Sequence, residues 1–246
     1  AMAAVKAKGT TRLFNCAKEP EIIQLCEFLN SMGSNIKGIG TDSLIIEGVK
    51  KLNQADITVI PDRIEAGTFL MVGALNGEIK ITNVIPLHLE KVTDKLIETG
   101  CQIIINDDSI SITPSDNLKS VDMTTAVFPG FPTDLQAQWV AIMSLSDSSA
   151  MVTDTVYHDR FSHVPELNRF GANISVKKNT AFVRGVKSLV GAPVMSTDIR
   201  ASASLIIAGL IAKGKTEISR IYHIDRGYEK IEEKFRSIGA KIYRES

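Results

Sequence analysis

The stretch Phe131-Pro132-Thr133-Asp134-Leu135-Gln136-Ala137-Gln138 decides how the rest of the chain is interpreted. It opens a predicted helix that runs on through Trp139 to Leu145. The T-x-x-Q spacing is that of a capping box, so Thr133 is the predicted N-cap and Asp134 lies in the first turn. The simplest interpretation of Asp134 is structural, because a carboxylate near a helix N-terminus gains about 0.3–1 kcal/mol from the helix dipole.

Four segments of the chain share the same series of sequence features. Each has a Gly or Ser turn, a β-rich run, an amphipathic helix and a closing glycine, in that order. The closing glycines are Gly33, Gly100, Gly171 and Gly239, which lie 67, 71 and 68 residues apart. A glycine directly after a helix is typical of the C′ position, where φ is positive. Apolar residues three and four apart predict that these four helices lie on a surface.

A second set of elements lies between those segments. Strands are predicted near residues 44–46, 110–112 and 181–183, and each is followed by a loop and a second helix. These helices begin near Asp62, Asp134 and Asp198 and are apolar on nearly every face, which is typical of a buried helix. Small residues in two of them permit close packing. The predicted fold is therefore α/β (α+β): an inside-out barrel of repeated units of about seventy residues with central helices.

The first nine residues match the end of an interior helix, as in residues 205–214. We therefore expect that the chain begins inside a repeat and is the C-terminal part of a longer protein. A natural start with a frayed first turn is the alternative.

Composition excludes several classes of function. The 246 residues carry no formal net charge, so no bulk nucleic-acid or membrane partner is indicated. No apolar run reaches the roughly 18 residues of a membrane span. Cys16, Cys26 and Cys101 have no C-x-x-C spacing and are predicted to be reduced thiols. The four histidines show no paired metal spacing, so neither a metal nor a cofactor is expected.

Arginines lie close to the predicted helix starts: Arg63, Arg160, Arg200 and Arg226. They could form local pairs with neighbouring aspartates, each worth about 0–1 kcal/mol when exposed. The interpretation we favour is a polyanion site, because arginine binds phosphate and carboxylate with two parallel hydrogen bonds.

A carboxylate among arginines stays ionised at neutral pH and can accept a proton from a substrate hydroxyl. Asp134 and Asp198 are the candidates for that role. The residues alone thus predict an anion-binding, hydroxyl-activating cleft on a repeat scaffold.

The same residues carry a resemblance. Residues 131–138, 160–167, 196–204 and 221–229 closely resemble motifs of the UDP-N-acetylglucosamine enolpyruvyl transferases, or 1-carboxyvinyltransferases. Residues 60–65 and 19–21 fit as well. The match runs nearly end to end and corresponds to the C-terminal three-fifths or so of that family's chain.

The resemblance implies two inside-out α/β domains with substrates in the cleft between them. The sugar 3′-hydroxyl attacks phosphoenolpyruvate, and phosphate leaves from a tetrahedral adduct. Asp134 would deprotonate that hydroxyl, and Val156 would supply a backbone contact to the UDP-sugar. Asp198, Arg160, Arg200 and Arg226 would surround phosphoenolpyruvate and the departing phosphate, with Asp198 and Arg226 counted as catalytic. The setting implied is the bacterial cytoplasm, in peptidoglycan synthesis.

The resemblance also implies what is missing. The family's loop acid, its N-terminal Lys-Asn pair and the N-terminal strand of one domain have no counterpart here. Residues 1–58 would be the last repeat of the loop-bearing domain, and residues 59–246 most of the other. We therefore expect no turnover without the N-terminal portion as partner. The alternatives are enolpyruvyl transfer to shikimate phosphate and a non-catalytic repeat scaffold.

Overall fold

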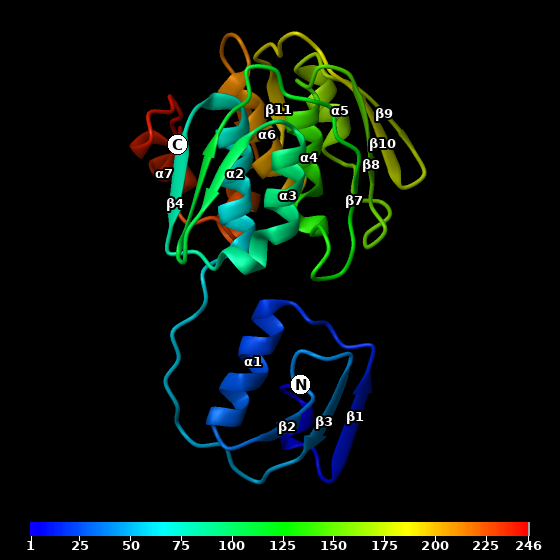
Figure 1. The fold of residues 1–246 in the computed structure, drawn as a ribbon, viewed down its shortest axis with the longest axis vertical. Helices are drawn as coiled ribbons and strands as arrows, with labels where there is room; N and C mark the ends of the chain where they lie inside the picture. Colours follow the sequence, from blue (N-terminus) through cyan, green and yellow to red (C-terminus); the bar gives the residue numbers. More distant parts are fainter. Residues whose placement is uncertain (246) are drawn as a thin grey trace. The chain divides into compact units, whose positions relative to one another are not determined.

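The computed structural model describes residues 1–245 and divides into two compact units (Figure 1). Unit 1 contains Ala1–Pro61 with Val127–Gly130, and unit 2 contains Asp62–Ala126 with the chain from Phe131 onward. The division after Pro61 lies close to the boundary expected between residues 58 and 59. The roles assigned to the two parts by resemblance stay proposals.

Unit 1 is a small sheet covered by one helix. Its strands are antiparallel in the order β1-β3-β2, and its helical elements are a short 3₁₀ turn and one α-helix. The bounds are η1 (Ala4–Lys6), β1 (Thr10–Phe14), α1 (Pro20–Ser31), β2 (Asn35–Lys37) and β3 (Ser43–Glu47). A core including Val5 of η1, Cys26 of α1 and Ile46 of β3 joins these elements. The predicted end of an interior helix at the start of the chain is thus a 3₁₀ turn with one buried side chain.

Three interior helices form the centre of unit 2, and they lie side by side in Figure 1. They are α2 (Arg63–Asn76), α4 (Gln136–Met143) and α6 (Ile199–Ile211). Every residue of α4 is buried, which confirms the predicted buried helix, although α4 ends at Met143, before Leu145. A Cβ added to Gly67 would lie 2.4 Å from the Leu135 side chain, so the absent side chain permits the close packing expected from the sequence.

Sheets surround these helices. The first is antiparallel in the order β4-β6-β5, the second has the order β7-β8-β10-β9 with β7 and β8 parallel, and the third is the parallel pair β11-β12. The bounds are β4 (Ile79–Thr82), β5 (Gln102–Ile105), β6 (Ser109–Thr113), β7 (Met123–Thr124), β8 (Ser149–Thr153), β9 (Asn173–Lys177), β10 (Thr180–Arg184), β11 (Pro193–Met195) and β12 (Glu217–Ser219). Alternate residues such as Ala181 and Val183 in β10 are buried, as in a half-covered sheet.

The remaining helices of unit 2 have between three and nine residues. They are η2 (Pro86–Leu89), α3 (Glu90–Glu98), η3 (Thr133–Leu135), α5 (Val164–Arg169), η4 (Ile221–Arg226) and α7 (Ile231–Ser237). The four closing glycines have φ between +86° and +99°, which confirms that they end their helices. None of the helices in residues 1–245 combines the length and the hydropathy needed to cross a membrane.

The capping box predicted at Thr133 is wrong. The first turn is the 3₁₀ helix η3, and no side chain caps it or α4. The Thr133 hydroxyl instead donates to Asp154 Oδ2 at 2.6 Å, and the Gln136 amide is buried with no hydrogen-bond partner among the described residues. In a cap the Thr133 oxygen would accept an amide N–H of the helix; here it accepts from Arg160 Nη1 at 3.2 Å while its proton goes to Asp154, so two charged partners replace the helix amide.

Candidate active site

Two of the interior helices begin with an aspartate that caps its own helix. Asp62 Oδ1 accepts the amides of Ile64 and Glu65 at 2.7 and 3.1 Å. Asp198 Oδ1 accepts the amides of Arg200 and Ala201 at 2.8 and 3.0 Å. Both side chains therefore satisfy amides that would otherwise lack a partner at a helix start.

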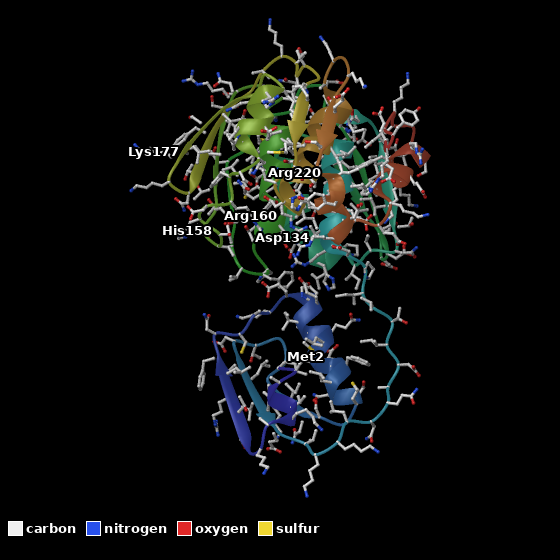
Figure 2. The ribbon with its side chains drawn as sticks, turned by 180° about the vertical axis from the view of Figure 1, so that it is seen from behind. Met2, Asp134, His158, Arg160, Lys177 and Arg220 are labelled. Atoms are coloured by element: carbon white, nitrogen blue, oxygen red, sulfur yellow. The ribbon has the colours of Figure 1, made fainter. Side chains whose placement is uncertain are left out.

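Asp134 lies just before α4, the remaining interior helix, and binds two arginines instead of capping that helix. Arg160 Nη1 donates to Asp134 Oδ1 at 2.7 Å, and Arg200 Nη2 lies 2.7 Å from Asp134 Oδ2. The partners come from the loop before α5 and from the first turn of α6; Figure 2 shows the labelled Asp134 and Arg160 next to each other. We call Asp134, Arg160 and Arg200 the carboxylate clamp.

The clamp is half-buried but reachable from solvent. The exposed fractions of its side chains are 32% for Asp134, 24% for Arg160 and 17% for Arg200. Burial by itself would raise the pKa of Asp134, but the charges and hydrogen bonds of Arg200 and Arg160 outweigh burial and hold this pKa below its ordinary value. The carboxylate is therefore ionised at neutral pH.

A buried polar cluster supports the clamp from within the helix core. Gln138 Nε2 donates to the Asp134 carbonyl at 3.1 Å and to Thr68 Oγ1 at 3.3 Å. Because Thr68 donates its own proton to the Ile64 carbonyl, the Tyr228 hydroxyl 2.8 Å away is the donor to Thr68. This cluster ties the turn that carries Asp134 to α2 and to the segment after η4.

The other two predicted arginines do not join the clamp. Arg63 is the first residue of α2. Arg226 ends η4, is exposed and forms no ion pair with the rest of residues 1–245, while its neighbour Asp225 is bound by both terminal nitrogens of Arg244, at 2.9 and 2.7 Å. The structure thus brings together two of the four arginines, and the pairing of Asp225 with Arg226 is replaced by a pair across nineteen residues.

Asp198 has little capacity left for proton transfer in this arrangement. Its Oδ1 caps α6, and its Oδ2 accepts the Ser162 hydroxyl at 2.9 Å. Burial would raise the pKa of Asp198, but the Ala201 and Arg200 amides, the Ser162 hydroxyl and nearby His163 together lower it. Asp198 therefore orders the segment next to the clamp in this structure.

Val156 is exposed on the loop after β8, but its amide is already used. The Val156 N–H donates to Asp154 Oδ1 at 2.9 Å. The backbone group that Val156 can offer a ligand is therefore its carbonyl, which accepts hydrogen bonds. The predicted backbone contact stays a prediction, now restricted to a donor group on the ligand.

Sequence reasoning missed two buried polar residues near the clamp. His163 is fully buried, its Nε2 has no partner among the described residues, and burial lowers its pKa from 6.5 to about 4. Asp154 is fully buried, and its carboxylate accepts four hydrogen bonds. Neither carries a spacing signal, because their burial depends on contacts with distant strands.

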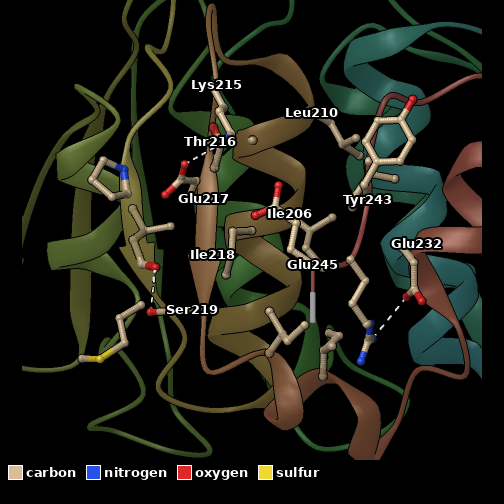
Figure 3. A pocket seen from close by; sticks show the side chains of 18 of the residues that line it. Ile206, Leu210, Lys215, Thr216, Glu217, Ile218, Ser219, Glu232, Tyr243 and Glu245 are labelled. Carbon is tan, nitrogen blue, oxygen red and sulfur yellow. Dashed lines mark hydrogen bonds and ion pairs between the residues drawn. The ribbon is translucent and has the colours of Figure 1, made fainter.

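A cavity of about 940 Å³ lies elsewhere in unit 2 (Figure 3). Its lining comes from α6, β11, β12 and the chain after α7, with apolar residues such as Ile206, Leu210 and Ile218. Charged pairs such as Lys215–Glu217 and Arg244–Glu232 also line it. Asp134, Arg160 and Arg200 are not part of its lining, so this cavity is separate from the carboxylate clamp.

Acid–base and electrostatic chemistry is what the clamp can perform. An ionised carboxylate lies between two guanidinium groups, which fits deprotonation of a hydroxyl beside a bound anion. No cluster of three or more His, Cys, Asp or Glu side chains suited to a metal ion occurs within residues 1–245. The three cysteines are unpaired, and Cys26 and Cys101 are buried.

Known proteins that this chain resembles in sequence are named as 1-carboxyvinyltransferases. The chain matches the family described as EPSP synthase (3-phosphoshikimate 1-carboxyvinyltransferase) over residues 1–235. It is 52% identical over 244 residues to a UDP-N-acetylglucosamine 1-carboxyvinyltransferase of Desulfosudis oleivorans and 51% identical over 245 residues to the protein of that name from Chlorobium luteolum. Each match covers 99% of this chain and 58% of the relative, so the chain spans less than two-thirds of these proteins.

Solved structures agree with the fold. The enolpyruvyl transferase NikO from Streptomyces tendae superimposes with a TM-score of 0.86 at 25% identity, covering 98% of this chain and 58% of that one. EPSP synthase from Acinetobacter baumannii superimposes with a TM-score of 0.74 at 20% identity, covering 100% of this chain and 60% of that one, and shows the fold alone. The predicted enolpyruvyl transferase-like α/β fold is confirmed, and the chain belongs to the EPSP synthase family.

Proposed function

We propose that this chain is part of an enzyme that transfers the enolpyruvyl group of phosphoenolpyruvate to the 3′-hydroxyl of UDP-N-acetylglucosamine. In this proposal phosphate is released, and the reaction is the first committed step of peptidoglycan synthesis in the bacterial cytoplasm. The observation that carries the proposal is the carboxylate clamp, Asp134 between Arg160 and Arg200. The names of relatives at 51–52% identity support the choice of substrates.

Asp134 is the general base of the proposed reaction. Its carboxylate takes the proton of the sugar 3′-hydroxyl while that oxygen forms a bond to the central carbon of phosphoenolpyruvate. The methylene carbon gains a proton from an acid outside this chain, which gives a tetrahedral adduct. Loss of a methyl proton and cleavage of the bond between the carbon and the phosphate oxygen then yield the enolpyruvyl ether and phosphate.

The clamp gives this base a way to respond to substrate. Both Asp134 oxygens accept from arginines, and those charges keep its pKa low, which makes it a weak base. An anionic phosphate competes with Asp134 for Arg160 and Arg200, because arginine binds phosphate bidentately. Anion binding would therefore raise the pKa of Asp134 and free lone pairs for the hydroxyl proton.

The remaining predicted site residues have supporting roles in this proposal. The Val156 carbonyl contacts the UDP-sugar, and Arg226 binds the phosphate or carboxylate of phosphoenolpyruvate. Asp198 keeps the role near the departing phosphate that the resemblance implies, and it reaches this role through the segment it orders. The arginines stabilise charge that develops as phosphate leaves.

The partner in this proposal is the N-terminal portion of the same enzyme, which supplies the loop acid. Residues 1–58 would complete the loop-bearing domain, and residues 59–246 would form most of the other. The chain alone is then expected to be inactive.

One alternative is transfer to shikimate phosphate, which the family description supports. The relatives at 51–52% identity favour the UDP-sugar instead. The other alternative, a non-catalytic scaffold, would gain if Asp134→Asn and Arg226→Ala both left ligand binding unchanged.

The test is phosphate release from phosphoenolpyruvate with UDP-N-acetylglucosamine, by this chain alone and mixed with the N-terminal portion of a relative. We expect release only in the mixture, with no release when shikimate phosphate replaces the UDP-sugar. Robust turnover by the chain alone would contradict the expected dependence on a partner. Turnover only with shikimate phosphate would establish the sister activity.

A further inference from the structure

Asp154 is a buried carboxylate whose hydrogen bonds converge from three parts of unit 2. Its Oδ1 accepts the Thr125 hydroxyl at 2.7 Å and the amides of Val156 and Tyr157 at 2.9 and 2.8 Å. Its Oδ2 accepts the Thr133 hydroxyl at 2.6 Å. No lysine or arginine in the described chain forms an ion pair with it, so hydroxyls and amides alone hold it.

The repeats show that the fold does not require a buried carboxylate here. In two other repeats the residue directly after the first strand is an exposed asparagine with positive φ, Asn15 after β1 and Asn83 after β4. The next residue then donates back to the sheet, as Val84 does to the Asp108 carbonyl at 3.0 Å. After β8, Asp154 itself donates to the Asn179 carbonyl at 2.8 Å and turns its carboxylate inward.

Two short paths lead from Asp154 to the clamp. Thr133 gives its only hydroxyl proton to Asp154, so its oxygen presents a lone pair, and Arg160 Nη1 donates to it at 3.2 Å. The same Nη1 donates to Asp134 Oδ1 at 2.7 Å. Along the second path, Tyr157, whose amide is bound by Asp154, places its ring 5.1 Å from the Arg160 guanidinium carbon.

We propose that Asp154 is a positioning residue that fixes Arg160 against Asp134 through the Thr133 hydroxyl and the Tyr157 ring. It does not touch substrate. It orders the loop that carries Val156 and Arg160, so that the guanidinium is already aligned when an anion arrives. Such alignment lowers the cost of reorganisation during the reaction. The positioning role in catalysis rests on the proposed function, whereas the alignment itself does not.

Two threonines on the same carboxylate provide a matched pair of variants. Thr133→Val and Thr125→Val each remove one hydroxyl donor from Asp154 and keep a β-branched side chain, but only Thr133 contacts Arg160. Both should unfold more easily, because each leaves an acceptor of Asp154 without its donor, and Thr125→Val also leaves the Thr155 amide without its acceptor. Thr133→Ser keeps the hydroxyl and should behave as the unmodified chain.

The readout is the pKa of the Asp134 carboxyl group, followed by carbon NMR and assigned by the signal missing in Asp134→Asn. We expect Thr133→Val and Asp154→Asn to raise this pKa toward its ordinary value, because Arg160 loses its alignment, and Thr125→Val and Thr133→Ser to leave it unchanged. An unchanged pKa in Thr133→Val, or an equal rise in Thr125→Val, would overturn the proposal.

Measuring phosphate release as well as the pKa of Asp134 distinguishes a failure of this inference from a failure of the proposed function. In the mixture with the N-terminal portion, Thr133→Val should lose about tenfold in phosphate release, and Thr133→Ser should restore it. If the unmodified mixture released no phosphate, the proposed function would fail, and the pKa measurement would still decide whether Asp154 aligns the clamp.

Discussion

The N-termini of α2 and α6 differ from that of α4 in how they use an aspartate. Asp62 and Asp198 turn back onto the amides of their own helices, whereas Asp134 lies in a 3₁₀ turn and extends to two arginines. The repeat places a carboxylate at all three helix starts. Where the aspartate caps its helix it contributes stability, and where the cap is absent it binds two arginines and is the base of the proposed reaction.

Replacing the uncapped aspartate should give the largest effect. Asp134→Asn removes the negative charge and the proton acceptor from the clamp, so phosphate release in the two-part mixture should fall by about 10²–10⁴-fold. The control is Asp62→Asn, because asparagine caps a helix about as well as aspartate and this variant should keep full turnover. Equal losses in both would remove the distinction between the two kinds of helix start.

Acid should destabilise the capped region near Asp198 through His163. Burial lowers the pKa of His163 from 6.5 to about 4, so between these values the unfolded chain binds a proton that the folded chain does not. The free energy of unfolding should therefore fall by roughly 3 kcal/mol as the pH drops through this window. Urea unfolding of His163→Asn should show a shallower fall, and the exposed His158→Asn should match the unmodified chain.

Removing a cap should cost stability and little else. Asp62→Ala leaves the Ile64 and Glu65 amides without their acceptor, and we expect the free energy of unfolding to drop by about 1 kcal/mol. Asp62→Asn should retain most of it. Denaturant unfolding measures both, and an unchanged midpoint in Asp62→Ala would show that the cap contributes nothing.

The smallest change in stability is expected at Arg226. It is exposed and forms no ion pair within residues 1–245, so Arg226→Ala should alter the free energy of unfolding by less than about 0.5 kcal/mol. Binding of phosphoenolpyruvate by the mixture, measured by calorimetry, should nevertheless weaken if Arg226 grips the anion. Unchanged affinity would confine the anion site to the clamp.

The sequence predicted what depends on local pattern. Buried helices followed from apolar residues on nearly every face, and the helix ends followed from glycines such as Gly33 and Gly239, because positive φ is a local property. The meeting of Arg160 and Arg200 at one carboxylate was predicted only as a cluster, because periodicity gives faces and not distances.

What the sequence did not show depends on contacts between distant segments. Thr133 has the spacing of a cap, yet its hydroxyl goes to Asp154, a residue twenty-one positions later. Arg226 follows an aspartate directly, yet that aspartate binds Arg244. In both cases a charged partner brought close by the tertiary fold displaces the local interaction that the motif predicts.

The central claim is tested most directly by phosphate release from phosphoenolpyruvate and UDP-N-acetylglucosamine, compared for Asp134→Asn and Asp62→Asn in the two-part mixture. We expect turnover to be lost in the first variant and kept in the second. Full turnover in Asp134→Asn, which lacks the carboxylate charge, would contradict the role of Asp134 as the general base.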